Sequence, residues 1–351
     1  MKLKKFSKKL RVIAIGILLT ALIALILSLQ GQNMILYAFM PDGDWTKGNG
    51  ITFYQADVTS PLSLSEKVSY TSEEMPGRDM SLMQARSGAL YGVVTNYDFA
   101  QNYEVVLYQG NHVKQLKPHY IDLGIRRVSQ SLGKDPKRIW APEFFQDTDG
   151  TTYLFTTVND KGETQDKSNE DVFHHSIYLS KIDVSNMKVL ETRLVNLPSD
   201  KNYIDAHVFQ REGKYYLLIK DEFSKAIDYY RSDDLNNWSL VKEDFLSYAL
   251  GESIDYTEGQ FTLNIEGTYY VFFDKYRGSG SYPKNQYVMT TTDFKNFSKP
   301  QVVTYSKKNI LRHGSAIVYQ EKPYEAIMFF KVMTGIQGII LICYVIAERK
   351  K

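Results

Sequence analysis

The chain has 351 residues, with 42 Lys and Arg against 40 Asp and Glu, and its formal net charge is +2. Residues 1–11 carry a net +6 and residues 348–351 a net +2, so residues 12–347 carry −6. This acidic middle part of the sequence argues against nucleic acid or another anionic polymer as a partner. The single cysteine, Cys343, excludes a disulfide framework. The sequence shows no zinc or haem spacing, Gly-rich phosphate loop or Gly-x-Ser-x-Gly motif.

The first element that the sequence predicts is a membrane helix. Residues 12–29 are apolar and uncharged, and six basic residues precede them. Eighteen residues just suffice to span a bilayer, and the basic flank predicts a cytoplasmic N-terminus. A cleaved signal peptide would share the basic start, but its apolar region is usually shorter, and no Ala-x-Ala site follows here. We therefore expect residues 1–31 to be a basic cytoplasmic tail and an uncleaved signal anchor.

Five short strands centred on aromatic residues come next, and their spacing indicates a repeat. Their reference tyrosines follow one another at 54, 62, 62 and 54 residues: Tyr37, Tyr91, Tyr153, Tyr215 and Tyr269. Most of these strands follow a Gly turn, and a Ser/Thr-Asp signature recurs in residues 231–238 and 291–297. Short strands with turn signals every 50–60 residues are typical of propeller blades. The sequence therefore predicts an all-β, five-bladed propeller over residues 33–325.

Four short acidic motifs stand 10 to 12 residues ahead of the last four tyrosines. They contain Asp79, Glu143, Asp205 and Glu258. This regular placement indicates that each repeat delivers a carboxylate to an equivalent position near the axis. Ahead of Tyr37 lies the apolar run instead, so we expect the missing strand of that blade to come from the C-terminal end, at residues 312–319. Such a ring closure removes exposed sheet edges, and it brings His313 beside the four acids.

A second apolar run occupies residues 326–347 and ends in a basic tail. Lys331 and Gln337 weaken its apolar character, and an apolar segment packed on the propeller is the alternative. The ring is complete before this run, however, and an exposed apolar segment would be a liability in water. We expect residues 326–351 to form a second transmembrane helix with a cytoplasmic end.

Carboxylates that converge on one axis suit the hydrolysis of a glycosidic bond. One carboxylic acid protonates the leaving oxygen, and a second carboxylate activates water or attacks carbon. A third acid nearby would raise the pKa of the first through like-charge repulsion, so that it stays protonated near neutral pH. Asp79, Asp205 and Glu258 supply this set, and Trp140 offers a flat face on which a sugar ring can stack. The sequence does not give the carboxyl separation, so inversion and retention stay open at this point.

A series of five motifs resembles glycoside hydrolase family 43 in order and spacing over nearly all of residues 33–322. The motifs are Arg78-Asp79, Trp140-Ala-Pro-Glu143, Ile204-Asp205, Glu258-Gly259 and Arg312-His313-Gly314. The resemblance implies a five-bladed propeller that acts with inversion, on arabinofuranosyl or xylosyl linkages in most members. It implies that Asp79 is the general base, that Glu258 is the general acid and that Asp205 orients Glu258 and tunes its pKa. It also implies that His313 helps to hold a calcium or other ion, through water, in the central channel.

Three positions depart from the family pattern. Met80 and Gln260 stand where many members have Pro, and Ala206-His207 follows the Ile-Asp motif in place of a small residue or Pro. These departures remove no carboxylate, so they bear on the substrate more than on the catalysis. Glu143, His207 and the exposed-looking Arg277 are candidate substrate-binding residues. A structural role is the alternative for each of them.

The resulting hypothesis is a glycosidase anchored in the cell membrane, with the catalytic domain on the outside of a bacterial cell and an oligo- or polysaccharide as its substrate. One alternative is a non-catalytic glycan-binding propeller, although binding alone would not require all three carboxylates. Another is a related five-bladed family that acts on fructosyl or mannosyl substrates. The Trp-Ala-Pro-Glu and Arg-His-Gly motifs argue against that family.

Overall fold

The computed structural model describes residues 2–29, 31–42, 50–96, 103–159, 174–278, 280–305 and 310–349. Its chain divides into two compact units. One unit is Ile35–Val318, and the other combines Met1–Met34 with Tyr319–Lys351. Each unit is described by itself below.

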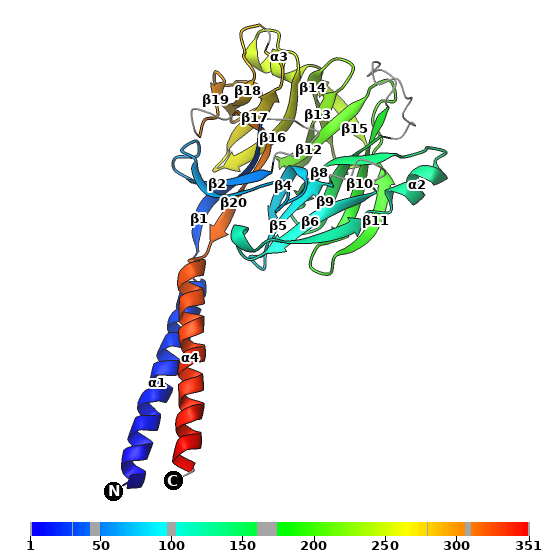
Figure 1. Cartoon of the computed structure of the whole chain (residues 1–351). Helices are drawn as coiled ribbons and strands as arrows, with labels where there is room; N and C mark the ends of the chain where they lie inside the picture. The colour runs from blue at the N-terminus through cyan, green and yellow to red at the C-terminus, as the bar shows by residue number, and fades with distance from the viewer. Residues whose placement is uncertain are drawn as a thin grey trace. The chain divides into compact units, whose positions relative to one another are not determined.

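The larger unit is a five-bladed β-propeller, as the sequence predicts (Figure 1). Each blade is a four-stranded sheet. The first blade consists of β20 (Leu311–Glu321), β1 (Gln32–Pro41), β2 (Ile51–Asp57) and β3 (Ser65–Tyr70). The second consists of β4 (Arg78–Gln84), β5 (Leu90–Thr95), β6 (Glu104–Gly110) and β7 (Lys117–Asp122). The third consists of β8 (Arg138–Gln146), β9 (Thr152–Asn159), β10 (His175–Asp183) and β11 (Lys188–Leu194).

The fourth blade consists of β12 (Tyr203–Arg211), β13 (Lys214–Asp221), β14 (Ala226–Ser232) and β15 (Trp238–Lys242). The fifth consists of β16 (Thr257–Ile265), β17 (Thr268–Lys275), β18 (Asn285–Thr291) and β19 (Gln301–Val302). Short helices lie between strands: η1 (Val113–Gln115), α2 (Ile125–Ser131) and α3 (Phe245–Leu250). The C-terminal strand β20 completes the blade of β1 to β3, which confirms the predicted ring closure.

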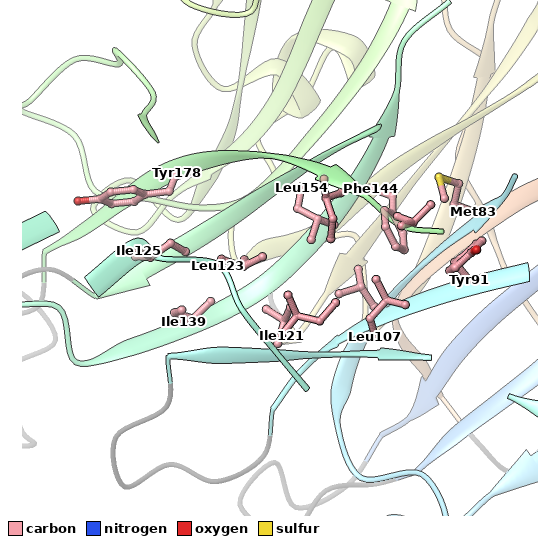
Figure 2. Close-up of a cluster of buried hydrophobic side chains, with 14 of the residues drawn as sticks. Met83, Tyr91, Leu107, Ile121, Leu123, Ile125, Ile139, Phe144, Leu154 and Tyr178 are labelled. Carbon is pink, nitrogen blue, oxygen red and sulfur yellow. The ribbon is translucent and has the colours of Figure 1, made fainter. Parts of the chain in front are cut away.

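The five aromatic strands are the second strands of the five blades, β1, β5, β9, β13 and β17. Their apolar side chains pack between neighbouring blades. Figure 2 shows one such cluster, in which Tyr91 and Leu107 of the second blade share a core with Phe144 and Leu154 of the third. Aromatic rings also pair across other blade boundaries, as Phe145 does with Tyr215, at 5.7 Å between ring centroids. The aromatic residues of these clusters thus pack between blades.

The recurring Ser/Thr-Asp signature forms the turn between the third and fourth strands of a blade. In the fourth blade, Asp234 Oδ1 accepts the backbone N–H groups of Asn236 and Asn237, at 2.9 Å each. In the fifth, Asp293 Oδ1 accepts those of Lys295 and Asn296, at 2.8 Å each. In such a turn the Asp carboxylate accepts hydrogen bonds from backbone N–H groups for which the strands supply no carbonyl partner. These aspartates are therefore structural.

The innermost strands share an irregularity that positions the pocket. One residue in each has positive φ: Asp79 (56°), Ala141 (40°), Asp205 (54°), Gly259 (57°) and His313 (28°). The pairing register also shifts at this point in β4, β8, β12 and β16. A bulge of this kind bends the strand and redirects side chains, and positive φ in non-glycine residues is a strain found at functional sites.

This alignment corrects the expectation that all four acids occupy equivalent positions. Asp79 and Asp205 occupy the positive-φ position itself. Glu143 lies two residues after Ala141, and Glu258 lies one residue before Gly259. The repeat therefore delivers two of the acids to equivalent places and two to places offset along the strand.

The smaller unit contains two long helices, α1 (Lys2–Leu29) and α4 (Tyr324–Arg349), which lie side by side (Figure 1). Leu10–Leu27 and Ala326–Ala347 are long and apolar enough to cross a membrane, by length and composition. The Thr20 hydroxyl donates to Gln337 Oε1 at 3.1 Å, and the Thr334 hydroxyl donates to Thr20 at 2.9 Å. The polar side chain of Gln337, which weakens the apolar pattern in the sequence, thus has a partner on the other helix.

Candidate active site

A pocket lies at the centre of the propeller, and residues from all five innermost strands line it. Its lining consists of Asp79, Met80, Ala141, Pro142, Glu143, Asp205, Ala206, His207, Gly259, Gln260, His313 and Gly314. The structure therefore brings most of the predicted site residues to one place. Glu258 does not line this pocket itself, but it reaches the same imidazole as Asp79 and Asp205.

His313 is the central side chain of the site. Its Nδ1 lies 3.2 Å from Asp79 Oδ1, and its Nε2 lies 3.6 Å from Asp205 Oδ2 and 3.3 Å from Glu258 Oε1. Burial alone would lower the pKa of His313, but the three carboxylates outweigh it and raise this pKa to about 9. At neutral pH the imidazole is therefore a cation, and it contacts carboxylates from three other blades.

Asp79 is an ionised carboxylate fixed at the axis. Its side chain is 7% exposed, and Oδ2 accepts from Arg78 Nε at 2.8 Å and from the Thr95 hydroxyl at 3.0 Å. Thr95 Oγ1 in turn accepts the backbone N–H of Ala141 at 2.8 Å. Burial favours the neutral acid, yet Arg78 and His313 prevail and keep the pKa of Asp79 below its usual range. Asp79 is thus suited to accept a proton at neutral pH.

Asp205 has the opposite ionisation tendency. Burial raises its pKa to about 6, and the attraction of His313 offsets this only in part. The backbone N–H of Asp205 donates to Thr157 Oγ1 at 3.1 Å, and its Oδ2 accepts the backbone N–H of Gly259 at 3.2 Å. Asp205 is therefore a carboxyl group that takes up a proton just below neutral pH.

Glu258 is held by cations on both of its oxygens. Lys220 Nζ lies 2.8 Å from Oε2, and Arg312 Nη2 lies 2.6 Å from Oε1. Burial would raise the pKa of Glu258, but Lys220, His313 and Arg312 together hold it well below its usual range. This corrects the expectation that like-charge repulsion keeps Glu258 protonated near neutral pH. Among the three predicted catalytic acids, the one with a raised pKa is Asp205.

Glu143 and His207 form a pair in the pocket wall. His207 Nδ1 lies 2.8 Å from Glu143 Oε1, and His207 Nε2 accepts the backbone N–H of Thr262 at 2.9 Å. An imidazole nitrogen that accepts a backbone N–H carries no proton, so the neutral ring carries its proton on Nδ1 and donates it to Glu143. The pair therefore presents a fixed carboxylate toward the pocket.

The other two predicted binding residues lie outside the lining of the pocket. The half-buried Trp140 packs against His175, with 5.1 Å between ring centroids. The exposed Arg277 lies over the ring of Tyr256 at 4.8 Å. The sugar-stacking role expected of Trp140 and the hydroxyl contact expected of Arg277 both stay predictions.

Sequence reasoning missed the cations and the additional acid around Glu258. Lys220 is 2% exposed and Asp274 is fully buried, and each is the first of two charged residues that end a second strand with an apolar middle. A charged residue in a strand buried on both faces needs a partner, so this pattern was the available signal. Arg312 belongs to a recognised motif, but its contact with Glu258 appears only in three dimensions.

A family model described as a probable glycosyl hydrolase domain, of the group related to glycosyl hydrolase family 43, matches residues 95–325, more than half of the chain. The chain belongs to this family. The recognition from sequence motifs is thereby confirmed. No protein with a curated function matches the chain.

Solved family-43 structures share the fold of this glycosyl hydrolase domain. A thermostable family-43 glycoside hydrolase is 13% identical with a TM-score of 0.50, and the match covers 73% of this chain and 87% of the other. An endo-arabinase from Bacteroides thetaiotaomicron is 11% identical with a TM-score of 0.50, and the match covers 78% and 90%. BlXynB from Bacillus licheniformis is 16% identical with a TM-score of 0.46; the match covers 63% of this chain but only 41% of BlXynB.

The resemblance implies an ion near His313, and the side chains here do not fit one bound directly. Ligand atoms of Asp205, Glu258 and His313 lie within 4.8 Å of one another. Both ring nitrogens of His313 face carboxylates at 3.2–3.6 Å, however, an arrangement that suits a protonated ring rather than a metal ligand. A metal ligand must be a neutral imidazole. An ion held through water elsewhere in the channel of this family-43-related domain stays a prediction.

Proposed function

We propose that the propeller hydrolyses O-glycosidic bonds, of arabinofuranosyl or xylosyl type, by an inverting acid/base mechanism. One observation carries this proposal: Asp79, Asp205 and Glu258 come from three different blades and meet at the same imidazole, that of His313. Family membership supports the reaction class. Binding of a sugar without turnover would not require three convergent carboxylates with different ionisation tendencies.

Asp79 is the general base in this proposal. A base must be ionised at the working pH and must face the substrate. Arg78 and Thr95 occupy Oδ2 of Asp79, whereas Oδ1 faces His313 and has no hydrogen-bond partner among the described residues. In this proposal Oδ1, which is buried in the structure beside the imidazole, is the oxygen that accepts the proton of the attacking water.

Glu258 is the general acid, and Asp205 orients it and tunes its pKa. Because Lys220 and Arg312 stabilise the ionised form of Glu258, the free enzyme has a protonated acid only at acidic pH. We therefore propose that kcat/KM falls as pH rises through the acidic range. The raised pKa of Asp205 favours a second assignment, in which Asp205 supplies the proton.

Leaving groups distinguish the two assignments. A variant without the general acid loses most activity on substrates with poor leaving groups and retains more on activated aryl glycosides, which need no protonation. If Glu258 is the acid, Glu258→Gln shows this selective loss and Asp205→Asn lowers activity on both kinds of substrate. The reverse pattern would assign the proton to Asp205.

Glu143 and His207 are proposed to bind hydroxyl groups of the sugar. The three departures from the family pattern, at Met80, at Ala206-His207 and at Gln260, all line the pocket. Gln260 Nε2 also donates to the carbonyl oxygen of Asp205. These residues shape the space around the substrate, so we propose that they adapt the site to a particular sugar. Trp140 and Arg277 are proposed to contact more distant parts of the glycan.

We further propose that α1 and α4 anchor the chain in the cell membrane, with both termini in the cytoplasm and the propeller on the outside. Two apolar helices of sufficient length support this, as do the basic residues at both chain ends. The substrate would then be an oligo- or polysaccharide near the cell surface. Protease accessibility of the propeller in intact cells, compared with broken cells, tests the orientation.

The decisive assay is hydrolysis of a panel of nitrophenyl glycosides by the full-length protein in detergent, with α-L-arabinofuranoside and β-D-xyloside foremost. Proton NMR of the released sugar identifies inversion or retention. We expect release of the sugar from one of these glycosides. On a disaccharide of the same sugar, whose leaving group needs protonation, we expect Glu258→Gln to reduce hydrolysis at least about 100-fold, the scale of general acid catalysis. Sugar binding without turnover in the unmodified protein would support the glycan-binding alternative and overturn the proposal.

A further inference from the structure

A buried carboxylate that the proposed mechanism does not use lies beside Glu258. Asp274, on β17, is fully buried and is the cross-strand partner of Glu258 on β16. Arg312 connects the two acids, because its Nε donates to Asp274 Oδ2 while its Nη2 donates to Glu258 Oε1 at 2.6 Å. The third nitrogen, Nη1, reaches Asp42 at 3.2 Å.

We propose that Asp274 is a positioning residue for Glu258 that acts through Arg312. The planar guanidinium group has donors in a fixed fork, so a carboxylate bound at Nε determines where Nη2 points. The backbone N–H of His313 also donates to Asp274 Oδ2, at 3.4 Å. Asp274 thus holds both residues of β20 that contact Glu258. The inference rests on the proposed role of Glu258 as the proton donor.

The burial of Asp274 is costly, which indicates more than a packing role. Its Oδ1 has no hydrogen-bond partner among the described residues, and a buried oxygen without a partner is destabilising. Burial, with repulsion from Glu258, raises the pKa of Asp274 to about 6, although Arg312 and His313 oppose this. The side chain of Gln286, its cross-strand neighbour on β18, is buried and forms no hydrogen bond in the described part of the chain.

The charges around Glu258 determine the sign of the effect. Lys220 on β13 and Arg312 and His313 on β20 favour its ionised form, whereas Asp205 on β12 and Asp274 on β17 oppose it. Asp42 and Lys284 continue the ion chain beyond Arg312, with 2.7 Å between Lys284 Nζ and Asp42 Oδ2. Asp274 itself carries a proton in the acidic range where Glu258 titrates, so its effect on Glu258 comes through Arg312. Without an acceptor at Nε, Arg312 stabilises the ionised form of Glu258 less well, and Glu258 retains its proton to higher pH.

The test is the pH dependence of kcat/KM for the full-length protein in detergent, on a disaccharide of the sugar that it releases best, because that leaving group needs protonation. Asp274→Ala removes the acceptor that holds Arg312 Nε. We expect the basic limb of the profile to move to higher pH by about one unit, the scale of one nearby charge. Asp274→Asn retains the shape and an acceptor for Arg312 and should leave the limb near its original position.

Asp228→Asn is the matched control. Asp228 is equally buried and pairs with Lys201 at 3.4 Å, and it makes no contact with Glu258 among the described residues. We expect this variant to lose stability without any displacement of the limb. A limb that stays in place or moves to lower pH in Asp274→Ala would overturn the inference. Failure of the proposed function itself would show separately, as activity on the disaccharide that survives Glu258→Gln in an otherwise unmodified protein.

Discussion

Replacement of Lys220 by Met tests the electrostatics of the site most directly. Lys220 Nζ lies 2.8 Å from Glu258 Oε2 and 2.6 Å from Glu222 Oε1, and its side chain is 3% exposed. Methionine has a similar length and no charge. Without the ammonium group, the ionised form of Glu258 is less stable, so Glu258 retains its proton to higher pH.

The size of the effect follows from the distance between the charges. At 2.8 Å and an effective dielectric constant of 20, the attraction is about 6 kcal/mol. This figure is an upper bound, because water and neighbouring groups relax around the empty position. A nearby opposite charge usually shifts a carboxyl pKa by about 1–3 units. We expect the basic limb of the kcat/KM profile to move to higher pH by an amount within that range.

The assay is the same pH profile, measured with a disaccharide whose leaving group needs protonation and with thermal unfolding recorded in parallel. Glu258 keeps Arg312 and Glu222 keeps Lys225 as partners, so the stability loss should stay below the roughly 3–5 kcal/mol of a buried acid left alone. Lys201→Met serves as the control, because Lys201 contacts other carboxylates. A limb that does not move, or that moves to lower pH, would refute the assignment of Glu258 as the acid under the control of Lys220.

Three further predictions concern stability. The folded-state pKa of His313, about 9, exceeds the unfolded value of 6.5. The charged imidazole therefore contributes about 3 kcal/mol of stability, which is complete below pH 6.5 and is lost as pH rises through 9. Thermal unfolding should show this loss between pH 7 and 10, and an equal loss in His313→Gln would contradict the prediction. A Cβ at Gly314 would overlap the ring of Phe39, so Gly314→Ala should lower the free energy of unfolding by about 1–3 kcal/mol. An unchanged denaturation midpoint would show that the ring moves freely. Gln337→Leu removes the hydrogen bond from the Thr20 hydroxyl. A double-mutant cycle with Thr20→Ala in detergent should give a coupling free energy of about 0.6 kcal/mol. A coupling of zero would mean that the two helices do not pack as described.

Much of the architecture follows from local sequence patterns. The spacing of the aromatic strands and the Asp turns predicts five blades, because strand alternation and turn chemistry act over a few neighbouring residues. The absent first strand predicts closure by residues 312–319, and β20 provides it. The same reasoning places Asp79, Asp205 and His313 around one axis, since an identical position in each repeat must face the centre.

The ionisation of those residues is a property of the tertiary structure alone. Glu258 is one residue out of step with Asp79 and Asp205, and that offset places its oxygens between Lys220 and Arg312, which come from other blades. Among the described residues no Lys or Arg forms an ion pair with Asp205, and burial outweighs the more distant attraction of His313 and Lys220 in its pKa. A carboxyl group takes its proton affinity from charges a few ångströms away, wherever they lie in the chain. The sequence therefore determines which acids meet at the axis, and only the fold decides which of them carries the proton.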